Sequence, residues 1–547
     1  MTNAVLRIAL AQINPTVGDI EANAQLIIDE TTRARETHNA DCVVFTELGL
    51  SGYPPEDLLL RSGLYPRIEN ALATIESALR DTAVIIGTPL REGDDIFNSA
   101  VVLHQGQRHV YRKRELPNYG VFDEKRHFTR SEQPLVVAIN GVNVGITICE
   151  DVWFSDVAKA ACGAGAQVLV SLNASPFDLH NQQQRDLQVR ARINENNVPV
   201  VYVNQVGGQD EVVFDGYSMI VDKSGEVVWR MPQFESAMAA VDVANDGSLS
   251  NAAGDAAPLP KELRTIYNAL VCGTRDYVNK NGFAGAVIGL SGGIDSALTL
   301  AIASDALGAE RVQAVMMPFD YTSQMSRDDA AQQAQTLGVE YSVIPIKSAY
   351  NSFVDALADE FAGLPRDTTE ENIQARCRGV LLMAISNKKR RIVLTTGNKS
   401  EMAVGYATLY GDMAGGFAPL KDVPKTLVYR LAEFCNQQAG KEIIPQRVID
   451  RPPSAELAPD QVDQDSLPPY DELDIILQRY IEEDWSVDDI VNDGFDRATV
   501  VRVVQMVVRN EYKRRQAPPG VRVTKRAFGR DRRYPITSGF EKNTSNH

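Results

Sequence analysis

The chain has 547 residues, of which 44% are hydrophobic and 23% are charged, and its formal net charge is -17. At about 150 residues per domain this length predicts more than one domain, and the composition excludes a disordered chain. The negative charge argues against broad nucleic-acid binding, and no run reaches the ~18 apolar residues that a membrane-spanning helix requires.

The start of the chain, MTNAVLRIALAQINPTVGD, lacks the basic and then apolar segments of a secretory signal. The cysteines lie far apart and form no Cys-x-x-Cys pair, which favours free thiols over a zinc site or a disulfide framework. We therefore expect a cytoplasmic protein.

Residues 1–245 contain short apolar runs that alternate with helix-like segments and turns. The runs are VLRIALAQI, CVVFTEL, AVIIGTPL, SAVVLH, VGITIC, QVLVSLNAS, VPVVYVNQ and YSMIVD. This alternation predicts a layered α/β domain. Residues 246–260 are rich in Gly, Ala, Ser and Pro and have no hydrophobic period, so we interpret them as a linker.

Cys149 stands at the end of one of these runs, in GITICEDVW. A buried structural cysteine is the commonest interpretation of such a position. A nucleophilic cysteine needs a base, and the histidines form no recognisable Cys/His arrangement. Glu47 in FTELGL and Lys113 in YRKREL offer a carboxylate and a cation instead.

The apolar runs GAVIGL, VQAVMMP, YSVIPI and RIVLTTG alternate with helix-like segments in the second part of the chain. This order predicts a doubly wound parallel sheet in a domain at residues 261–515, followed by a basic tail at residues 516–547. A basic cluster, Lys513-Arg514-Arg515 and then Arg522 to Arg533, favours a phosphorylated small substrate, and a solvated tail is an equal alternative for the residues beyond Arg522.

The loop Gly289-Leu-Ser-Gly-Gly-Ile-Asp-Ser296 lies between the first of these runs and a helical segment. Backbone N–H groups and the helix dipole favour an anion at such a place. The loop lacks the lysine of the common nucleotide triphosphatase loop. Because Asp295 would repel a phosphate without a bridging cation, the loop predicts magnesium-bound pyrophosphate.

The string Ser-Gly-Gly-x-Asp-Ser resembles the pyrophosphatase loop of enzymes that cleave ATP between its α and β phosphates. Further segments in the same order resemble NAD synthetase, at residues 370–378, 395–401, 410–413, 419–425, 451–457 and 511–515. The resemblance implies an ATP pyrophosphatase domain of the adenine nucleotide alpha hydrolase type. It also implies ATP and deamido-NAD as substrates and Mg2+ as cofactor.

The same resemblance assigns residues to each ligand. The implied ATP-binding positions are Gly289, Leu290, Ser291, Gly292, Gly293, Ile294, Asp295, Ser296, Thr396, Lys425 and Ser454. The implied deamido-NAD positions are Asn372, Arg376, Glu401 and Lys513, and the implied metal ligands are Asp295 and Glu401. Taken singly, a lysine is usually solvated and Glu401 is equally suited to cap a helix. Leu409 stands where ammonia-using relatives often carry a lysine.

The segments around Glu47, Lys113 and Cys149 resemble the Glu-Lys-Cys set of the nitrilase superfamily, over most of residues 4–245. That resemblance implies a four-layer α-β-β-α sandwich. It also implies that Glu47 is a general base, that Lys113 stabilises an oxyanion, and that Cys149 attacks an amide carbon.

Glutamine-dependent members of that superfamily extend the resemblance to Tyr119 and Ser175, which it places in glutamine binding, and Glu124 would be a second carboxylate. A basic residue often follows at the position of Asn181, which we keep as a glutamine-binding candidate, and Arg185 is a possible replacement.

Together the two parts resemble glutamine-dependent NAD synthetases. The implied ligase releases ammonia from glutamine and amidates adenylylated deamido-NAD, giving glutamate, NAD, AMP and pyrophosphate. The resemblance also implies a homo-oligomer with an internal ammonia passage. The expected partners are small molecules, and we expect no nucleic-acid or membrane partner. The alternatives are another glutamine-using ATP pyrophosphatase, such as a GMP synthetase or a tRNA-modifying enzyme, and a catalytically silent assembly or nucleotide-sensing protein.

Overall fold

The computed structural model describes residues 5–79, 81–179, 181–252, 257, 261–454, 456–458 and 463–540. The chain divides into two compact units, Met1–Pro260 and Lys261–His547. None of the helices described is long and apolar enough to cross a membrane.

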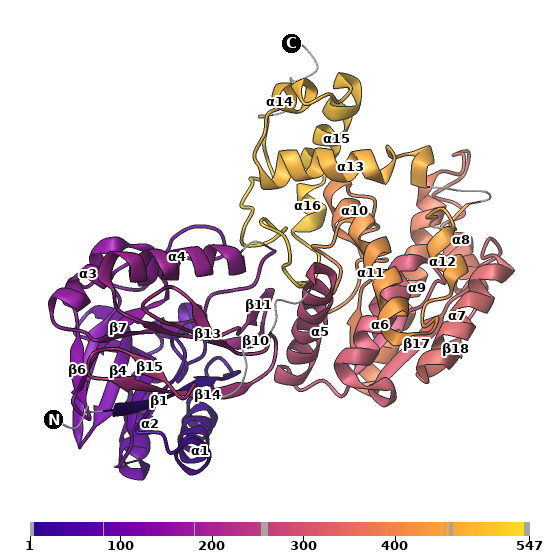
Figure 1. The fold of residues 1–547 in the computed structure, drawn as a ribbon. Helices are drawn as coiled ribbons and strands as arrows, with labels where there is room; N and C mark the ends of the chain where they lie inside the picture. The colour runs from indigo at the N-terminus through magenta and orange to yellow at the C-terminus, as the bar shows by residue number, and fades with distance from the viewer. Residues whose placement is uncertain are drawn as a thin grey trace. The chain divides into compact units, whose positions relative to one another are not determined.

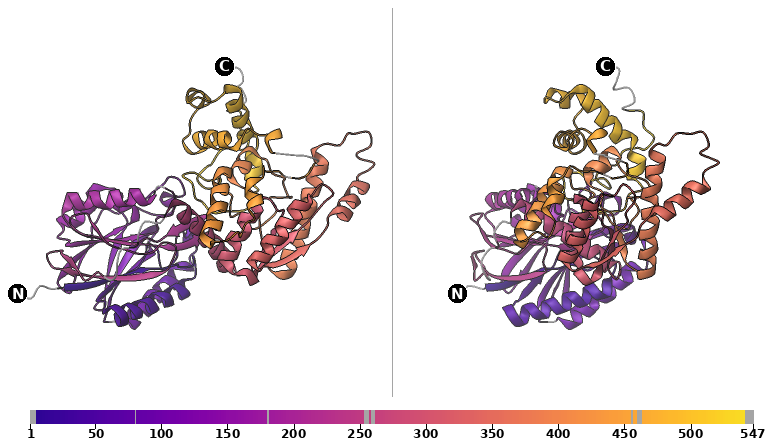
Figure 2. Two further views of the ribbon diagram at one scale, coloured as in Figure 1. Left: turned by 45° about the vertical axis from the view of Figure 1, so that its right-hand side comes forward. Right: turned by 90° about the vertical axis from the view of Figure 1, so that its right-hand side faces the viewer.

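The first unit contains two sheets packed face to face, each covered on its outer face by a pair of helices (Figures 1 and 2). In spatial order, the first sheet is β15 (Leu249–Ser250), β14 (Ala237–Ala244), β1 (Val5–Gln12), β2 (Cys42–Val44), β3 (Ala83–Glu92), β4 (Asp95–His104) and β5 (Gln107–Arg112). The second is β13 (Val227–Arg230), β12 (Met219–Val221), β9 (Val200–Asn204), β8 (Val168–Asn173), β7 (Val142–Ile148) and β6 (Val136–Ile139). A hairpin of β10 (Val206–Gln209) and β11 (Val212–Asp215) stands apart.

Helices α1 (Ile20–His38) and α2 (Leu64–Ala78) pack on the first sheet, and α3 (Ser155–Gly163) and α4 (Asn181–Asn196) pack on the second. The four-layer α-β-β-α sandwich expected from the sequence is therefore confirmed. The strands have apolar side chains on both faces because each sheet is covered on both sides.

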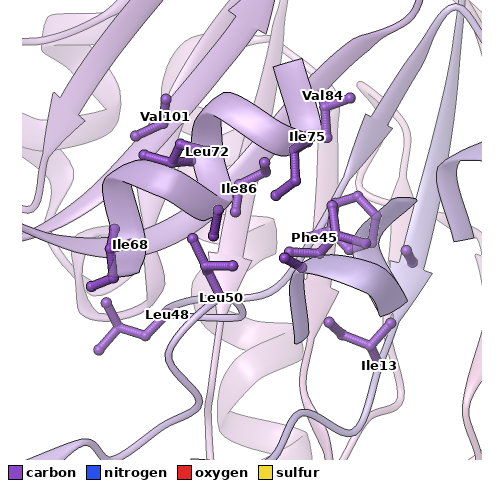
Figure 3. Close-up of a cluster of buried hydrophobic side chains, with 14 of the residues drawn as sticks. Ile13, Phe45, Leu48, Leu50, Ile68, Leu72, Ile75, Val84, Ile86 and Val101 are labelled. Carbon is purple, nitrogen blue, oxygen red and sulfur yellow. The ribbon is translucent and has the colours of Figure 1, made fainter. Parts of the chain in front are cut away.

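Strand β3 shows how the sequence produces this layering. Its alternate residues Val84 and Ile86 face α2, while Ala83 and Ile85 face the other sheet. Ile68, Leu72 and Ile75 recur at helical spacing and form the buried face of α2 (Figure 3). Burial of such a side chain contributes about 1.5–3 kcal/mol, so the packing of α2 on β3 stabilises this layer.

The segment that we interpreted as a linker is partly built into the first unit. Within it, β15 pairs with β14. Residues 253–256 and 258–260 lie outside the residues that the structure describes.

The second unit has a parallel sheet in the order β18 (Glu340–Val343), β17 (Val312–Met316), β16 (Ala286–Gly289) and β19 (Ile392–Leu394). Helices α8 (Lys347–Ala356) and α9 (Thr368–Lys389) cover one face, and α6 (Ile294–Leu307) packs on β16 and β17. The doubly wound sheet is confirmed. The chain moves outward from β16 to β18 and then returns to the other side of β16, which creates a switch point between β16 and β19.

The remaining helices surround this sheet or form the helical end of the unit. Their bounds are α5 (Glu262–Lys280), α7 (Gln324–Leu337), α10 (Lys399–Val404), α11 (Lys425–Ala439), α12 (Gln446–Asp450), α13 (Tyr470–Leu477), α14 (Val487–Asn492), α15 (Arg497–Arg509) and α16 (Glu511–Arg514). Buried residues of α10, α13 and α15 share a cluster. Helix α10 is thus supported by the C-terminal helices.

Part of the stretch expected as a basic tail is packed into the second unit. Val521 and Val523 are buried, and Arg522 and Arg532 form ion pairs of 2.7 Å with Asp531 and Glu511. These arginine charges are compensated within the protein.

Candidate active sites

The first unit brings Glu47, Lys113 and Glu124 together in its interior. Glu47 follows β2 and Lys113 follows β5, so both stand just past strand ends. The Lys113 ammonium donates to Glu47 Oε1 at 2.7 Å and to both oxygens of Glu124 at 2.9 Å. Burial lowers the pKa of Lys113, but the charges of Glu124 and Glu47 outweigh burial and raise it well above the usual value. Both carboxylates therefore favour the charged form of Lys113.

Glu47 is held by groups from three other parts of the unit. Besides Lys113, its carboxylate accepts hydrogen bonds from Asn98 Nδ2 at 2.8 Å and from the backbone N–H of Ala174 at 3.0 Å. Gly87 of β3 passes so close that a Cβ there would lie 2.3 Å from Leu48 N. The orientation of Glu47 thus depends on neighbours that sequence spacing does not reveal.

Cys149 directly follows β7 and begins a short 3-10 helix, η3 (Cys149–Trp153). Its φ is 46°, in the left-handed region that non-glycine residues rarely adopt, so the cysteine stands on a sharp turn. Burial, followed by the charge of Glu47, raises the pKa of the Cys149 thiol well above its usual value, while Lys113 opposes the shift. The raised pKa favours the neutral thiol, so nucleophilic attack requires a base.

Glu124 is a second buried carboxyl group at this site. Burial raises its pKa to about 7, and the Lys113 charge opposes that shift. Tyr53 donates a hydrogen bond of 2.8 Å to Glu124 Oε1. The carboxyl group thus has an ionisation close to neutral pH.

The predicted glutamine-binding residues lie in two places. Tyr119 is exposed and donates from its hydroxyl to both oxygens of Glu150 at 3.0 and 2.9 Å. Ser175 is buried, and Asn181 at the start of α4 donates to the carbonyl of Pro176 at 2.8 Å. Glu150, next to the cysteine, did not enter the sequence interpretation although CEDVW displays it.

Arg185 does not offer a free charge to a ligand. Its guanidinium is buried and pairs with Asp215 at 2.7 Å. Its other donors reach Ser175 Oγ at 2.9 Å and the carbonyl oxygens of Ser175 and Pro176 at 2.8 Å. Arg185 therefore supports the Ser175 segment and does not replace the basic residue absent at Asn181.

In the second unit, the predicted loop at residues 289–296 lies at the switch point. Ser291 and Ser296 order it: Gly293 N donates to Ser291 Oγ at 3.1 Å, and Ser296 Oγ donates to Gly293 O at 2.9 Å. Gly292 has a φ of 81°, and a Cβ there would lie 2.3 Å from Ser326 O. The side chains of Leu290 and Ile294 are buried, and the Leu290 N–H donates to Val315 O at 3.0 Å, which fixes the start of the loop to the sheet.

Asp295, Glu401 and Lys425 meet beside this loop. Lys425 Nζ lies 2.6 Å from Asp295 Oδ2 and 3.1 Å from Glu401 Oε1, and Asn398 Nδ2 donates to Asp295 Oδ1 at 2.9 Å. Burial lowers the pKa of Lys425, but Asp295 and Glu401 outweigh burial and raise it. Glu401 also completes the capping box of α10 with Asn398, so the capping and site interpretations both apply.

The oxygen donors of Asp295 and Glu401 suit Mg2+, which proteins bind through one or two carboxylates together with substrate phosphates. Among the described residues, no group of three or more His, Cys, Asp or Glu residues is arranged to hold a metal. Two carboxylates next to the predicted phosphate-binding loop fit a magnesium ion held together with phosphates.

The other predicted ATP residues are less closely gathered. Thr396 follows β19 at the switch point and is half-buried. Ser454 is exposed, and its Oγ accepts from Glu456 N at 3.1 Å. Glu456 in turn accepts from Ser323 and Ser326 at 3.0 and 2.7 Å, which links this segment to the start of α7.

The predicted deamido-NAD residues converge on the segment that follows α10. Asn372 accepts from Thr408 Oγ1 at 2.9 Å, and Arg376 donates to the carbonyl of Leu409 at 3.2 Å. Lys513 donates to the carbonyls of Gly405 and Ala407, both at 2.9 Å. Residues 405–409 thus connect Asn372, Arg376 and Lys513 to the helix that carries Glu401.

Known proteins match both units. A family model of carbon-nitrogen hydrolases matches residues 7–248, and one of NAD synthase matches residues 266–517. A glutamine-dependent NAD(+) synthetase of Acinetobacter baylyi is 48% identical, covering 98% of each chain, and one of Thermotoga maritima is 46% identical, covering 98% of this chain and 99% of that one. The ADP complex of the Acinetobacter baumannii glutamine-dependent NAD+ synthetase is 46% identical, with a TM-score of 0.79 over 98% of this chain and 99% of that one. Because the similarity runs through both units, the chain belongs to the glutamine-dependent NAD(+) synthetases.

Proposed function

We propose that the first domain hydrolyses glutamine and the second uses the ammonia to convert deamido-NAD and ATP into NAD, AMP and pyrophosphate. The observation that carries this proposal is the pairing of two sites in one chain. A Glu47–Lys113 ion pair of 2.7 Å lies in the carbon-nitrogen hydrolase part, and an Asp295–Lys425–Glu401 set lies beside the pyrophosphate loop. We place these activities in the domains at residues 1–245 and 261–515, to which the fold adds β15 and the stretch around Val521, respectively.

In the glutaminase site, Glu47 takes the proton of Cys149 as the sulfur attacks the amide carbon of glutamine. The Lys113 ammonium stabilises the resulting oxyanion. Glu47 then gives its proton to the leaving nitrogen, ammonia departs, and a thioester remains. Water, deprotonated by Glu47, attacks the thioester, glutamate leaves, and the proton returns to the sulfur. Tyr119, Ser175 and Asn181 bind glutamine, and the Glu150 carboxylate suits its α-ammonium group.

In the synthetase site, a carboxylate oxygen of deamido-NAD attacks the α-phosphorus of ATP and pyrophosphate leaves. Ammonia then attacks the adenylylated carbonyl carbon, loses a proton, and AMP leaves. The loop from Gly289 to Ser296, with Thr396, Lys425 and Ser454, holds ATP. Asn372, Arg376, Glu401 and Lys513 bind deamido-NAD. Asp295 and Glu401 would hold Mg2+, which supplies charge neutralisation for the phosphates.

An internal passage would keep the ammonia unprotonated, since free ammonia at neutral pH is mostly ammonium and cannot attack. The passage, the homo-oligomer, the cytoplasmic location and the absence of a nucleic-acid partner stay predictions of the sequence analysis.

The test is NAD formation from deamido-NAD and Mg-ATP, with glutamine or ammonium as nitrogen donor, for the native protein and for Cys149→Ala. We expect the substitution to abolish glutamine use and to leave ammonium use within about twofold, because Cys149 acts only in releasing ammonia. Glutamine use that survives would make Cys149 structural. A native protein that forms no NAD from either donor would show that deamido-NAD is the wrong acceptor.

A further inference from the structure

Asp151 lies two residues beyond Cys149, and its buried carboxylate has four hydrogen-bond donors around it. Oδ2 accepts from the backbone N–H of Ile148 at 2.9 Å and from the Tyr111 hydroxyl at 2.7 Å. Oδ1 accepts from the backbone N–H of Arg114 at 3.1 Å and of Glu115 at 2.9 Å. The two oxygens therefore face different parts of the chain.

These donors flank the two reacting side chains. Ile148 immediately precedes Cys149, while Arg114 and Glu115 immediately follow Lys113. The cysteine follows β7 of the six-stranded sheet, and the lysine follows β5 of the seven-stranded sheet. Sheets packed face to face are held mainly by apolar contacts, which have no direction and tolerate sliding. Hydrogen bonds restrict distance and angle.

We infer that Asp151 is a positioning residue that sets the relative placement of the Cys149 sulfur and the Lys113 ammonium, by binding the backbone beside each. It holds the ends of two strands from different sheets at a fixed separation. It also anchors the residue before the left-handed turn on which Cys149 stands. In this role Asp151 takes no proton, and its hydrogen bonds come from three backbone N–H groups and the Tyr111 hydroxyl. This inference rests on the proposed roles of Cys149 and Lys113.

Asp151→Asn tests the inference because an amide keeps the size of the side chain but replaces one acceptor by a donor. The amide nitrogen must face either the Ile148 side or the Arg114 and Glu115 side, so one of the two backbone anchors is lost. We expect kcat for glutamine-dependent NAD formation to fall about 100-fold, with the glutamine KM within about threefold, as for a reacting group displaced by about 1 Å. The ammonium-dependent rate shows whether the synthetase domain is folded, and we expect it to stay within about twofold of the native rate.

The second readout is the pH dependence of Cys149 alkylation by iodoacetamide. Because the Lys113 charge favours the thiolate, a cysteine displaced from it should be alkylated only at higher pH. If Asp151 acted only on the fold, loss of its negative charge would leave this profile unchanged or move it to lower pH, never to higher pH. Tyr111→Phe removes a single donor and keeps the carboxylate, so it provides a milder variant, with an expected three- to tenfold fall in kcat and the same direction of shift.

The matched control is Asp156→Asn, an exposed acid on α3 that pairs with Arg114 Nη2 at 3.3 Å. It is expected to leave the glutamine kcat and the alkylation profile unchanged. The inference is overturned if Asp151→Asn keeps the glutamine kcat within threefold of native. It is also overturned if kcat falls while the alkylation profile stays unshifted. If Asp151→Asn does not fold, the inference is overturned when Tyr111→Phe changes neither kcat nor the alkylation profile. Glutamine use by Cys149→Ala would refute the proposed function instead.

Discussion

Lys113 is a cation enclosed by two carboxylates, and this arrangement links the first site to pH. A buried ammonium is costly unless it is paired, and Glu47 and Glu124 provide that pairing. Burial raises the pKa of Glu124 from 4.5 to about 7, so the folded chain binds this proton more tightly than the unfolded one. Glu124 therefore lowers the free energy of unfolding as the pH rises from 4.5 to 7, by up to about 1.4 kcal/mol per pH unit.

We expect the native kcat/KM for glutamine to fall as the pH drops through about 7, because protonated Glu124 no longer balances Lys113. Glu124→Gln should lack this acidic limb and run about 100-fold more slowly. The measurement is initial glutamate release across pH 5 to 9. Glu92→Gln, at an exposed pair with Arg112, is the control and should keep the native profile. If Glu124→Gln keeps an acidic limb near neutral pH, the limb belongs to another group.

At the scale of the elements, Glu47, Lys113 and Cys149 lie just past strand ends, and Lys425 begins a helix. Strand β3 packs closely against the first of these positions, since Gly87 lets its backbone approach residues 46–48. Any side chain at that position would displace the turn that carries Glu47. In the second unit, α10 presents Asn398 and Glu401 to Asp295 and Lys425 through its first turn.

Gly87→Ala is expected to lower the glutamine-dependent kcat about 100-fold while the ammonium-dependent rate stays near native. A Cβ 2.3 Å from Thr46 O and Leu48 N forces the turn to move and so misplaces Glu47. Paired rate measurements with the two nitrogen donors check this. Gly63→Ala, at a helix start with open space around its Cβ, is the control and should behave as native. A native glutamine rate in Gly87→Ala would mean that the turn shifts without moving the base.

For the whole molecule, each unit supports its own site with chain segments that are distant in sequence. In the second unit, the segment after residue 516 returns to the site helix. The Asp422 carboxylate accepts from the backbone N–H groups of Val523 and Thr524 at 2.9 and 2.7 Å, and Lys399 Nζ lies 2.9 Å from Asp422 Oδ1. Lys399 begins α10, so the C-terminal segment braces the helix that carries Glu401.

Asp422→Asn is expected to destabilise the second unit by about 1–3 kcal/mol, because Lys399 loses one carboxylate partner but keeps Glu482 at 2.6 Å. Ammonium-dependent NAD formation should then be lost at a lower temperature than in the native protein, as measured by residual activity after heating. Asp484→Asn removes an exposed partner of Arg526 and is the control, with an expected effect below about 1 kcal/mol. Equal heat sensitivity of the native protein and Asp422→Asn would show that the segment does not brace α10.

The sequence by itself determined both fold classes and the residue types of both sites. Periodic apolar runs identify buried strands, and a glycine-rich loop or a set of short motifs stays readable because its residues are adjacent in the chain. It also displayed Glu150 and Asp151 beside Cys149, but their spacing carries no signal of what they bind. Only the tertiary structure decided three features of the first site. They are the ion pair of Arg185 with Asp215, the hydrogen bonds from Asn98 and Ala174 to Glu47, and the close approach of Gly87 to the Glu47 turn. The physical reason is that each depends on the distance between elements from separate layers, which packing sets and local sequence does not encode.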